Sequence, residues 1–166
     1  MNKYLKFASV AAFLAISTLF SPSVFAAENP VTGNTIEYRI VDREANLKSF
    51  LVKYKSPLAD YASVFIQAAD KYNIDYRILP AISCIESTCG KFLLPETHNP
   101  FGWGKGIISF VSYYESINKV QDGMYKIYYS KGLDTPEKIA PVYDPPSPET
   151  WSRAVRSFMN QIDSVE

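Results

Sequence analysis

The sequence is poor in the residues from which metal sites are built. Its 166 residues include a single histidine, His98, and only two cysteines, Cys84 and Cys89. Zinc and similar ions need about four such ligands close together, and no cluster of ligands surrounds His98. We therefore expect no metal and no other cofactor.

An excess of positive charge is also missing, because 17 Lys and Arg residues are balanced by 17 Asp and Glu residues. Proteins that bind nucleic acids usually carry a basic stripe or patch, and none accompanies the aromatic residues, so we expect no nucleic-acid partner. Tyrosine is abundant, with 12 residues. Tyrosine and tryptophan stack on sugars but also pack in small cores, so composition alone does not separate these two uses.

The apolar run over residues 7–20 is shorter than the about 20 residues that a membrane-spanning helix needs. It follows Lys3 and Lys6 and precedes the small residue Ala26, which is the order of a secretory signal peptide. We expect cleavage after Ala26, against the alternative of an uncleaved anchor, and no stable membrane insertion afterwards. Removing residues 1–26 from 166 leaves 140 residues with 15 basic and 17 acidic side chains, which suits one domain.

Apolar periodicity predicts an all-α fold, or a mainly α fold with one small β-hairpin. An N-terminal segment, residues 27–55, contains a short helix that starts after Asp42 or Arg43, and the main domain covers residues 56–166. The expected elements of that domain are a helix over residues 56–73, a helix from Asp75 or Pro80 to about Thr88, a loop or hairpin over residues 90–106, a helix capped by Ser112 and stopped by Gly132, a helical turn after Thr135 with a proline-stiffened loop behind it, and a final helix capped by Ser147.

Glu86 occupies an unusual place in the stretch AISCIESTCGK. At roughly 100° per residue, a helical wheel puts it inside the apolar arc that contains Ile82 and Ile85. A desolvated carboxylate is costly unless it is paired or takes up a proton. Glu86 is therefore either a general acid that holds a proton near neutral pH or a structural residue that reaches a nearby Lys or Arg.

Cys84 and Cys89 flank Glu86. Five residues of regular helix rise about 7.5 Å, beyond the roughly 7 Å limit for the Cα atoms of a disulfide. A disulfide therefore requires the helix to end near Thr88, and Gly90 suits such an end. We expect this disulfide, which would hold the chain just after Glu86; the alternative is two buried thiols.

Four segments, DYRILPAISCIESTCGK, NPFGWGKG, SYYESINKV and IAPVYDPPSPETWSRAVRSFMNQI, together resemble the lysozyme superfamily. The resemblance is nearest to its lytic transglycosylase and bacterial endo-β-N-acetylglucosaminidase branches and covers roughly residues 56–162. It implies a lysozyme-like catalytic domain over residues 56–166. It also implies an enzyme that acts on peptidoglycan glycan strands. Together with the expected signal peptide, this predicts a secreted protein, periplasmic or at the cell surface, and we expect it to be a monomer.

The resemblance also assigns roles to single residues. Glu86 matches the catalytic acid, and Tyr143 resembles a late active-site tyrosine, although DPPS follows it instead of the usual small residues. The positions that match the substrate-binding part of the pattern are Ser87, Asn99, Phe101 and Gly102. Trp103 either stacks on a sugar or plugs the core, and Trp151 is expected in the core.

A second catalytic carboxylate is not evident. The candidates, each with a structural explanation as a cap, a solvated helix position or loop surface, are Glu96, Glu115, Asp122 and Asp144. A lone acid fits attack by the muramic 6-hydroxyl, which gives an anhydro sugar, or participation of the N-acetyl group, which gives hydrolysis. Two other functions remain open: a non-catalytic module that binds glycans or a partner, and an enzyme for another amino-sugar polymer such as chitin.

Overall fold

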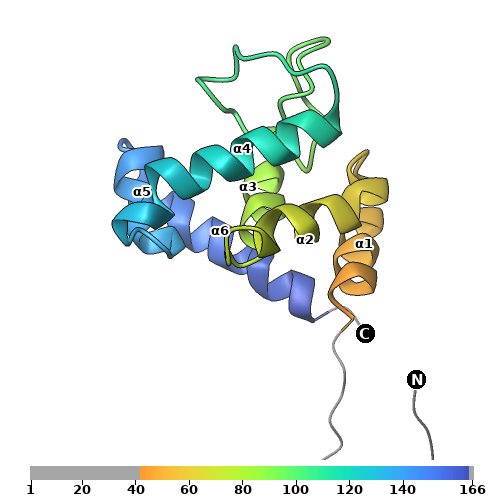
Figure 1. The fold of residues 1–166 in the computed structure, drawn as a ribbon, viewed down its shortest axis with the longest axis horizontal. Helices are drawn as coiled ribbons and strands as arrows, with labels where there is room; N and C mark the ends of the chain where they lie inside the picture. Colours follow the sequence, from red (N-terminus) through yellow and green to blue (C-terminus); the bar gives the residue numbers. More distant parts are fainter. Residues whose placement is uncertain (1–41, 165–166) are drawn as a thin grey trace, which may run out of the picture. The chain divides into compact units, whose positions relative to one another are not determined.

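A computed structural model describes residues 42–164, which form an all-α unit (Figure 1). Its elements are α1 (Arg43–Lys53), a 3₁₀ turn η1 (Ala59–Tyr61), α2 (Ala62–Asp70), α3 (Ile78–Ser87), α4 (Tyr113–Ile127), a 3₁₀ turn η2 (Tyr129–Lys131), α5 (Pro136–Tyr143) and α6 (Pro148–Asp163). The prediction of an all-α fold is confirmed. No strand occurs between residues 42 and 164, so the optional hairpin at residues 90–106 is a loop. The expected signal peptide, residues 1–26, lies outside the described residues.

Short polar side chains start several helices as the sequence predicts. The Asp42 carboxylate accepts a hydrogen bond from the third backbone N–H of α1, and the Ser112 hydroxyl does the same for Glu115 at 3.2 Å. Glu115 in turn accepts from the Val111 N–H at 2.8 Å, one residue before the position that a standard capping box would use. Thr135 caps α5, with Pro136 in the first turn. These contacts satisfy N–H groups that have no partner inside the helix.

Three boundaries differ from the predictions. The helix expected over residues 56–73 is divided into η1 and α2, because the Ser56 hydroxyl bonds to the Leu58 N–H and the Cys89 carbonyl instead of capping a long helix. The segment expected as a proline-stiffened loop is helical as far as Tyr143, with Pro141 inside α5. The Ser147 side chain makes no capping hydrogen bond at the start of α6.

The core is built around α3, of whose ten residues eight are buried. This helix packs on α6, which also contacts α1 and α5, while α2 lies between α1 and α4. A helix that is apolar on nearly all sides must be surrounded in this way. Helix α1 adds Leu47, Phe50 and Leu51 to the same core, all fully buried, and each such side chain contributes about 1.5 to 3 kcal/mol. The packed unit therefore includes α1 as well as the residues from 56 onward.

The long segment between α3 and α4 extends beyond the end of α3 and loops out on one side of α4 (Figure 1). It carries strongly exposed apolar side chains, among them Phe92, Ile107 and Val111. None of the helices in the described part of the chain combines the length and hydropathy that crossing a membrane requires.

Candidate active site

Glu86 is the second-last residue of α3, where the chain turns sharply. Thr88, Cys89 and Gly90 all have positive φ angles, 53°, 57° and 81°. A disulfide joins Cys84 to Cys89 across this turn, and the helix ends near Thr88, as the disulfide requires. The left-handed end begins at Thr88, two residues before the glycine that was expected to provide it. The turn holds the end of α3, and with it Glu86, in a defined position.

The carboxyl of Glu86 lies at the edge of the apolar surface of α3. The helical wheel predicted a position inside that arc, but the residue as a whole is exposed. Its Oε1 atom accepts a hydrogen bond of 3.2 Å from the indole Nε1–H of Trp151. No Lys or Arg among residues 42–164 forms an ion pair with it. The described residues therefore do not show the alternative role, in which Glu86 would pair with a Lys or Arg.

The surroundings of this carboxyl favour its protonated form. Desolvation by neighbouring groups raises the pKa of Glu86 above its usual value, and the negative charge of Asp144 raises it further. The hydrogen bond from Trp151 stabilises the charged form and opposes this shift, but it is the smaller effect. Glu86 therefore keeps its proton to a higher pH than an ordinary glutamate while remaining open to solvent.

Gly102 lies directly against the Glu86 carboxyl. A Cβ atom at Gly102 would come within 2.6 Å of Oε2 of Glu86, and the φ angle there is +62°. Both the close approach and the left-handed backbone require glycine. The loop after α3 thus returns to form a wall beside the carboxyl group.

Tyr143, at the end of α5, links this loop to α6. Its hydroxyl donates a 2.6 Å hydrogen bond to the carbonyl of Phe101, the neighbour of Gly102. Its ring stacks on Trp151 with 4.8 Å between centroids. Burial raises the pKa of the Tyr143 phenol well above its usual value, and the charge of Glu86 adds to this effect. Tyr143 is therefore a permanent hydrogen-bond donor that holds the wall next to Glu86.

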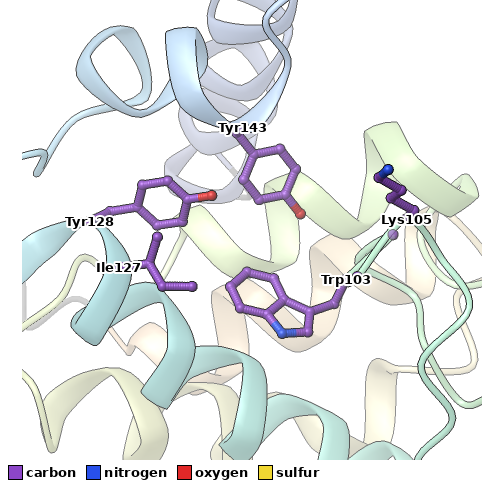
Figure 2. A pocket seen from close by; sticks show the side chains of 7 residues that line it. Trp103, Lys105, Ile127, Tyr128 and Tyr143 are labelled. Atoms are coloured by element: carbon purple, nitrogen blue, oxygen red, sulfur yellow. The ribbon is translucent and has the colours of Figure 1, made fainter.

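Two hollows meet at Gly102 and together are called the cleft below. One, of about 330 Å³, is lined by Glu86, Ser87, Phe92, Leu93, Leu94, Asn99, Gly102 and Gly106. The other, of about 310 Å³, is lined by Gly102, Trp103, Gly104, Lys105, Ile127, Tyr128 and Tyr143. Figure 2 shows the rings of Trp103, Tyr128 and Tyr143 around this second hollow. Glu86 thus lies in one hollow, next to the residue that borders both.

Three of the predicted substrate-binding residues prove to be internal braces. Asn99 is buried, and its amide donates to the carbonyls of Trp103 and Ile108 while accepting from the Trp103 N–H. The hydroxyl of Ser87 is within hydrogen-bond distance of the Ser83 and Pro100 carbonyls and accepts from the Gly90 N–H.

The third brace, Phe101, is fully buried and packs edge-on against Phe65. Ser87 and Asn99 line the hollow that contains Glu86, whereas Phe101 lines neither hollow, and the side chains of all three are occupied inside the protein. Buried backbone N–H and C=O groups need hydrogen-bond partners, and an irregular loop has no helix or sheet to supply them, so side chains such as those of Asn99 and Ser87 pair with these groups.

Trp103 packs against α4 and also borders a hollow. Its ring lies so close to α4 that a Cβ atom at Gly123 would be 2.4 Å from Cζ2 of the indole. The same side chain is half-buried and lines the second hollow. It is thus packed on one helix and still accessible to a ligand.

The four candidate second carboxylates have different surroundings. Glu115 caps α4, Asp122 pairs with Lys126, and Glu96 is exposed. Asp144, interpreted from the sequence as loop surface, is half-buried and is the one of the four whose charge acts on Glu86. Asp144 thus lies in a loop, as expected, and also contributes to the electrostatic environment of Glu86.

Trp151, Lys105 and Tyr128 belong to the cleft, but were not predicted there. Trp151 was expected in the core and is 4% exposed, yet its indole N–H reaches Glu86. The ring of Tyr128, a residue to which the sequence assigned no site role, lines the second hollow. For Lys105, the one feature of the sequence that could have pointed to the site is its position between Gly104 and Gly106 in the glycine-rich loop.

Residues 42–164 contain no group of three His, Cys, Asp or Glu side chains placed to hold a metal ion. No model of a known protein family matches the chain, and a search of curated proteins finds no significant match.

Proposed function

We propose that the chain is an exported enzyme that cleaves the β-1,4 links between N-acetylmuramic acid and N-acetylglucosamine in peptidoglycan. The observation that carries this proposal is the Glu86 carboxyl. It is accessible from a hollow, free of any cation among the described residues, and desolvated enough to have a raised pKa. A general acid for glycoside cleavage needs this combination of access and a retained proton.

In the proposed mechanism, the Glu86 carboxyl donates its proton to the glycosidic oxygen as the bond from that oxygen to the anomeric carbon breaks. The leaving sugar departs with a hydroxyl group, and positive charge develops on the other ring. The Glu86 carboxylate then accepts a proton from the attacking group. If the 6-hydroxyl of the same muramic residue attacks, a 1,6-anhydro sugar forms; if the N-acetyl group assists and water attacks, a reducing end forms.

Tyr143 is assigned a positioning role in this scheme. Its hydroxyl bonds to the Phe101 carbonyl at 2.6 Å, and Phe101 precedes the glycine that touches Glu86. Holding the reacting group to within a fraction of an ångström is worth orders of magnitude in rate. Asp144 contributes through its charge, which favours the protonated acid.

Replacing Glu86 with glutamine tests the proposal. Glu86→Gln keeps the shape of the side chain but cannot transfer the proton, so we expect loss of cleavage with an unchanged circular dichroism spectrum. Glu96→Gln is the matched control, because Glu96 is exposed and lines neither hollow. Mass spectrometry of products from purified sacculi separates anhydro-muramic ends from reducing ends. If Glu86→Gln solubilises sacculi as fast as the parent protein, Glu86 is not the acid.

A non-catalytic glycan-binding module is the second candidate. It is favoured by the aromatic walls of the hollow at Trp103, Tyr128 and Tyr143, because stacking on sugars needs no ionisable group. This function predicts saturable binding to glycan strands, equal for the parent and Glu86→Gln, without new chain ends of either kind.

A further inference from the structure

The hollow beside Gly102 combines aromatic walls with one charged group. Trp103, Tyr128 and Tyr143 supply flat apolar surface on which a sugar ring can stack. Among residues 42–164, Lys105 is the only charged residue that lines this hollow. Figure 2 shows Lys105 across the hollow from Tyr128 and Ile127, on the side toward which the Tyr143 hydroxyl points.

Nothing in the described part of the chain neutralises Lys105. No carboxylate of residues 42–164 lies within ion-pair distance of its ammonium group, and the residue is exposed. Its φ angle is +60°, a conformation that costs a residue with a side chain about 1 to 2 kcal/mol and that glycine adopts freely. Glycines occupy the positions on both sides, so the lysine is held where glycine would be easier to accommodate.

Neither Glu86 nor Asp144 lines the aromatic hollow. Glu86 belongs to the other hollow, and Asp144 acts on Glu86. A carboxylate on a substrate bound in the aromatic hollow therefore meets the positive charge of Lys105 and, among the described lining residues, no negative charge.

From this arrangement we propose that the aromatic hollow binds the sugar that carries a carboxylate, with Lys105 as the group that pairs with it. In peptidoglycan this is the muramic residue, whose carboxylate belongs to its lactyl side arm or to the peptide attached there. The inference rests on the proposed function, because it concerns the same cleft. It makes Lys105 the residue that distinguishes peptidoglycan from chitin, a neutral polymer of the shared N-acetylglucosamine unit.

Binding to the inactive Glu86→Gln protein tests this inference without relying on catalysis. Tryptophan fluorescence is titrated with neutral chitotetraose, with an alternating N-acetylglucosamine–N-acetylmuramic acid tetrasaccharide that has free lactyl carboxylates, and with the same tetrasaccharide carrying its peptides. Introducing Lys105→Gln into the Glu86→Gln protein should weaken binding of at least one anionic ligand by roughly threefold to tenfold at low salt. The same change should weaken binding of chitotetraose by less than about twofold. The loss should shrink at high salt because the ion pair is screened.

Lys119→Gln is the matched control, since Lys119 is exposed on α4 and lines neither hollow. It changes the net charge equally and should leave all three affinities unchanged. A larger loss with free lactyl groups identifies that carboxylate as the partner of Lys105, and a larger loss with the peptide-bearing ligand identifies the peptide.

Equal effects on neutral and anionic ligands, an effect of Lys119→Gln as large as that of Lys105→Gln, or no binding at millimolar concentration would overturn the inference. The proposed function fails separately. If the parent protein binds through Lys105 but releases no products from sacculi, the enzymatic proposal alone is wrong. If it cleaves sacculi and Lys105→Gln binds all ligands normally, the inference alone is wrong.

Discussion

Replacing Gly102 with alanine should disable the cleft while leaving the fold intact. Two effects contribute to the result and can be separated. Alanine at a φ angle of +62° is strained by about 1 to 2 kcal/mol, which lowers the melting temperature of a domain of this size by about 4 °C per kcal/mol. The second effect is local: the new Cβ atom would lie 2.6 Å from Oε2 of Glu86, whereas ordinary contacts begin at 3.4 Å. The carboxyl must therefore move by about 0.8 Å.

A shift of that size breaks the geometry on which the proposed chemistry depends. The hydrogen bond from Trp151 to Glu86 is already 3.2 Å long and would be lost or redirected. Displacing a reacting group by about 1 Å costs roughly 100-fold in rate. We therefore expect Gly102→Ala to release soluble products from dye-labelled sacculi about 100 times more slowly than the parent protein.

Gly132→Ala is the control for backbone strain. Gly132 has a φ angle of +77°, and a Cβ atom there would meet no atom within 4 Å. Both variants should lose similar thermal stability in melts followed by circular dichroism, and both should be folded at an assay temperature well below their melting points. Only Gly102→Ala should lose activity. If it stays within about threefold of the parent protein, or if Gly132→Ala loses as much, the contact between Gly102 and Glu86 does not control the reaction.

Three further predictions follow from other contacts. Trp151→Phe removes the hydrogen bond that lowers the pKa of Glu86. Because the acid must be protonated, the pH at which activity is lost on the alkaline side should rise. An unchanged or lower value of this pH in the pH–rate profile would contradict the assignment. Replacing Cys84 and Cys89 together with serine opens a short loop with a sequence separation of 5, and urea titration should show a free energy of unfolding about 2 kcal/mol lower; an unchanged midpoint would mean that the disulfide constrains little. The hydroxyl of Tyr129 is buried without a hydrogen-bond partner in the described part of the chain, so Tyr129→Phe should raise the free energy of unfolding by about 1 kcal/mol, whereas a loss of stability in thermal melts would reveal a partner for the hydroxyl.

The sequence alone was sufficient for the helical class and for placing Glu86 near the end of an apolar helix. Both depend on local patterns: apolar residues at helical spacing, Ser112 as a cap, and a glutamate at the end of an apolar helix between two cysteines. Interactions within four or five residues are set by backbone geometry and do not need the rest of the fold. The positions of α1, α3 and α4 could therefore be predicted closely, whereas the boundaries near Ser56 and Pro141 depended on contacts with other segments.

Tertiary structure decided what surrounds Glu86. Trp151 follows it by 65 residues, and an apolar stripe predicts that an indole is buried without showing which carboxyl its N–H will meet. The loop after α3 has no repeating pattern, so the sequence could not indicate that Asn99 and Ser87 turn inward while Lys105 stays exposed. The buried backbone groups of that loop must be paired, and whichever polar side chains pair with them are no longer available to a ligand. Which side chains take part is decided only when the loop packs against α3, α4 and α5, because packing determines which backbone groups lose contact with water.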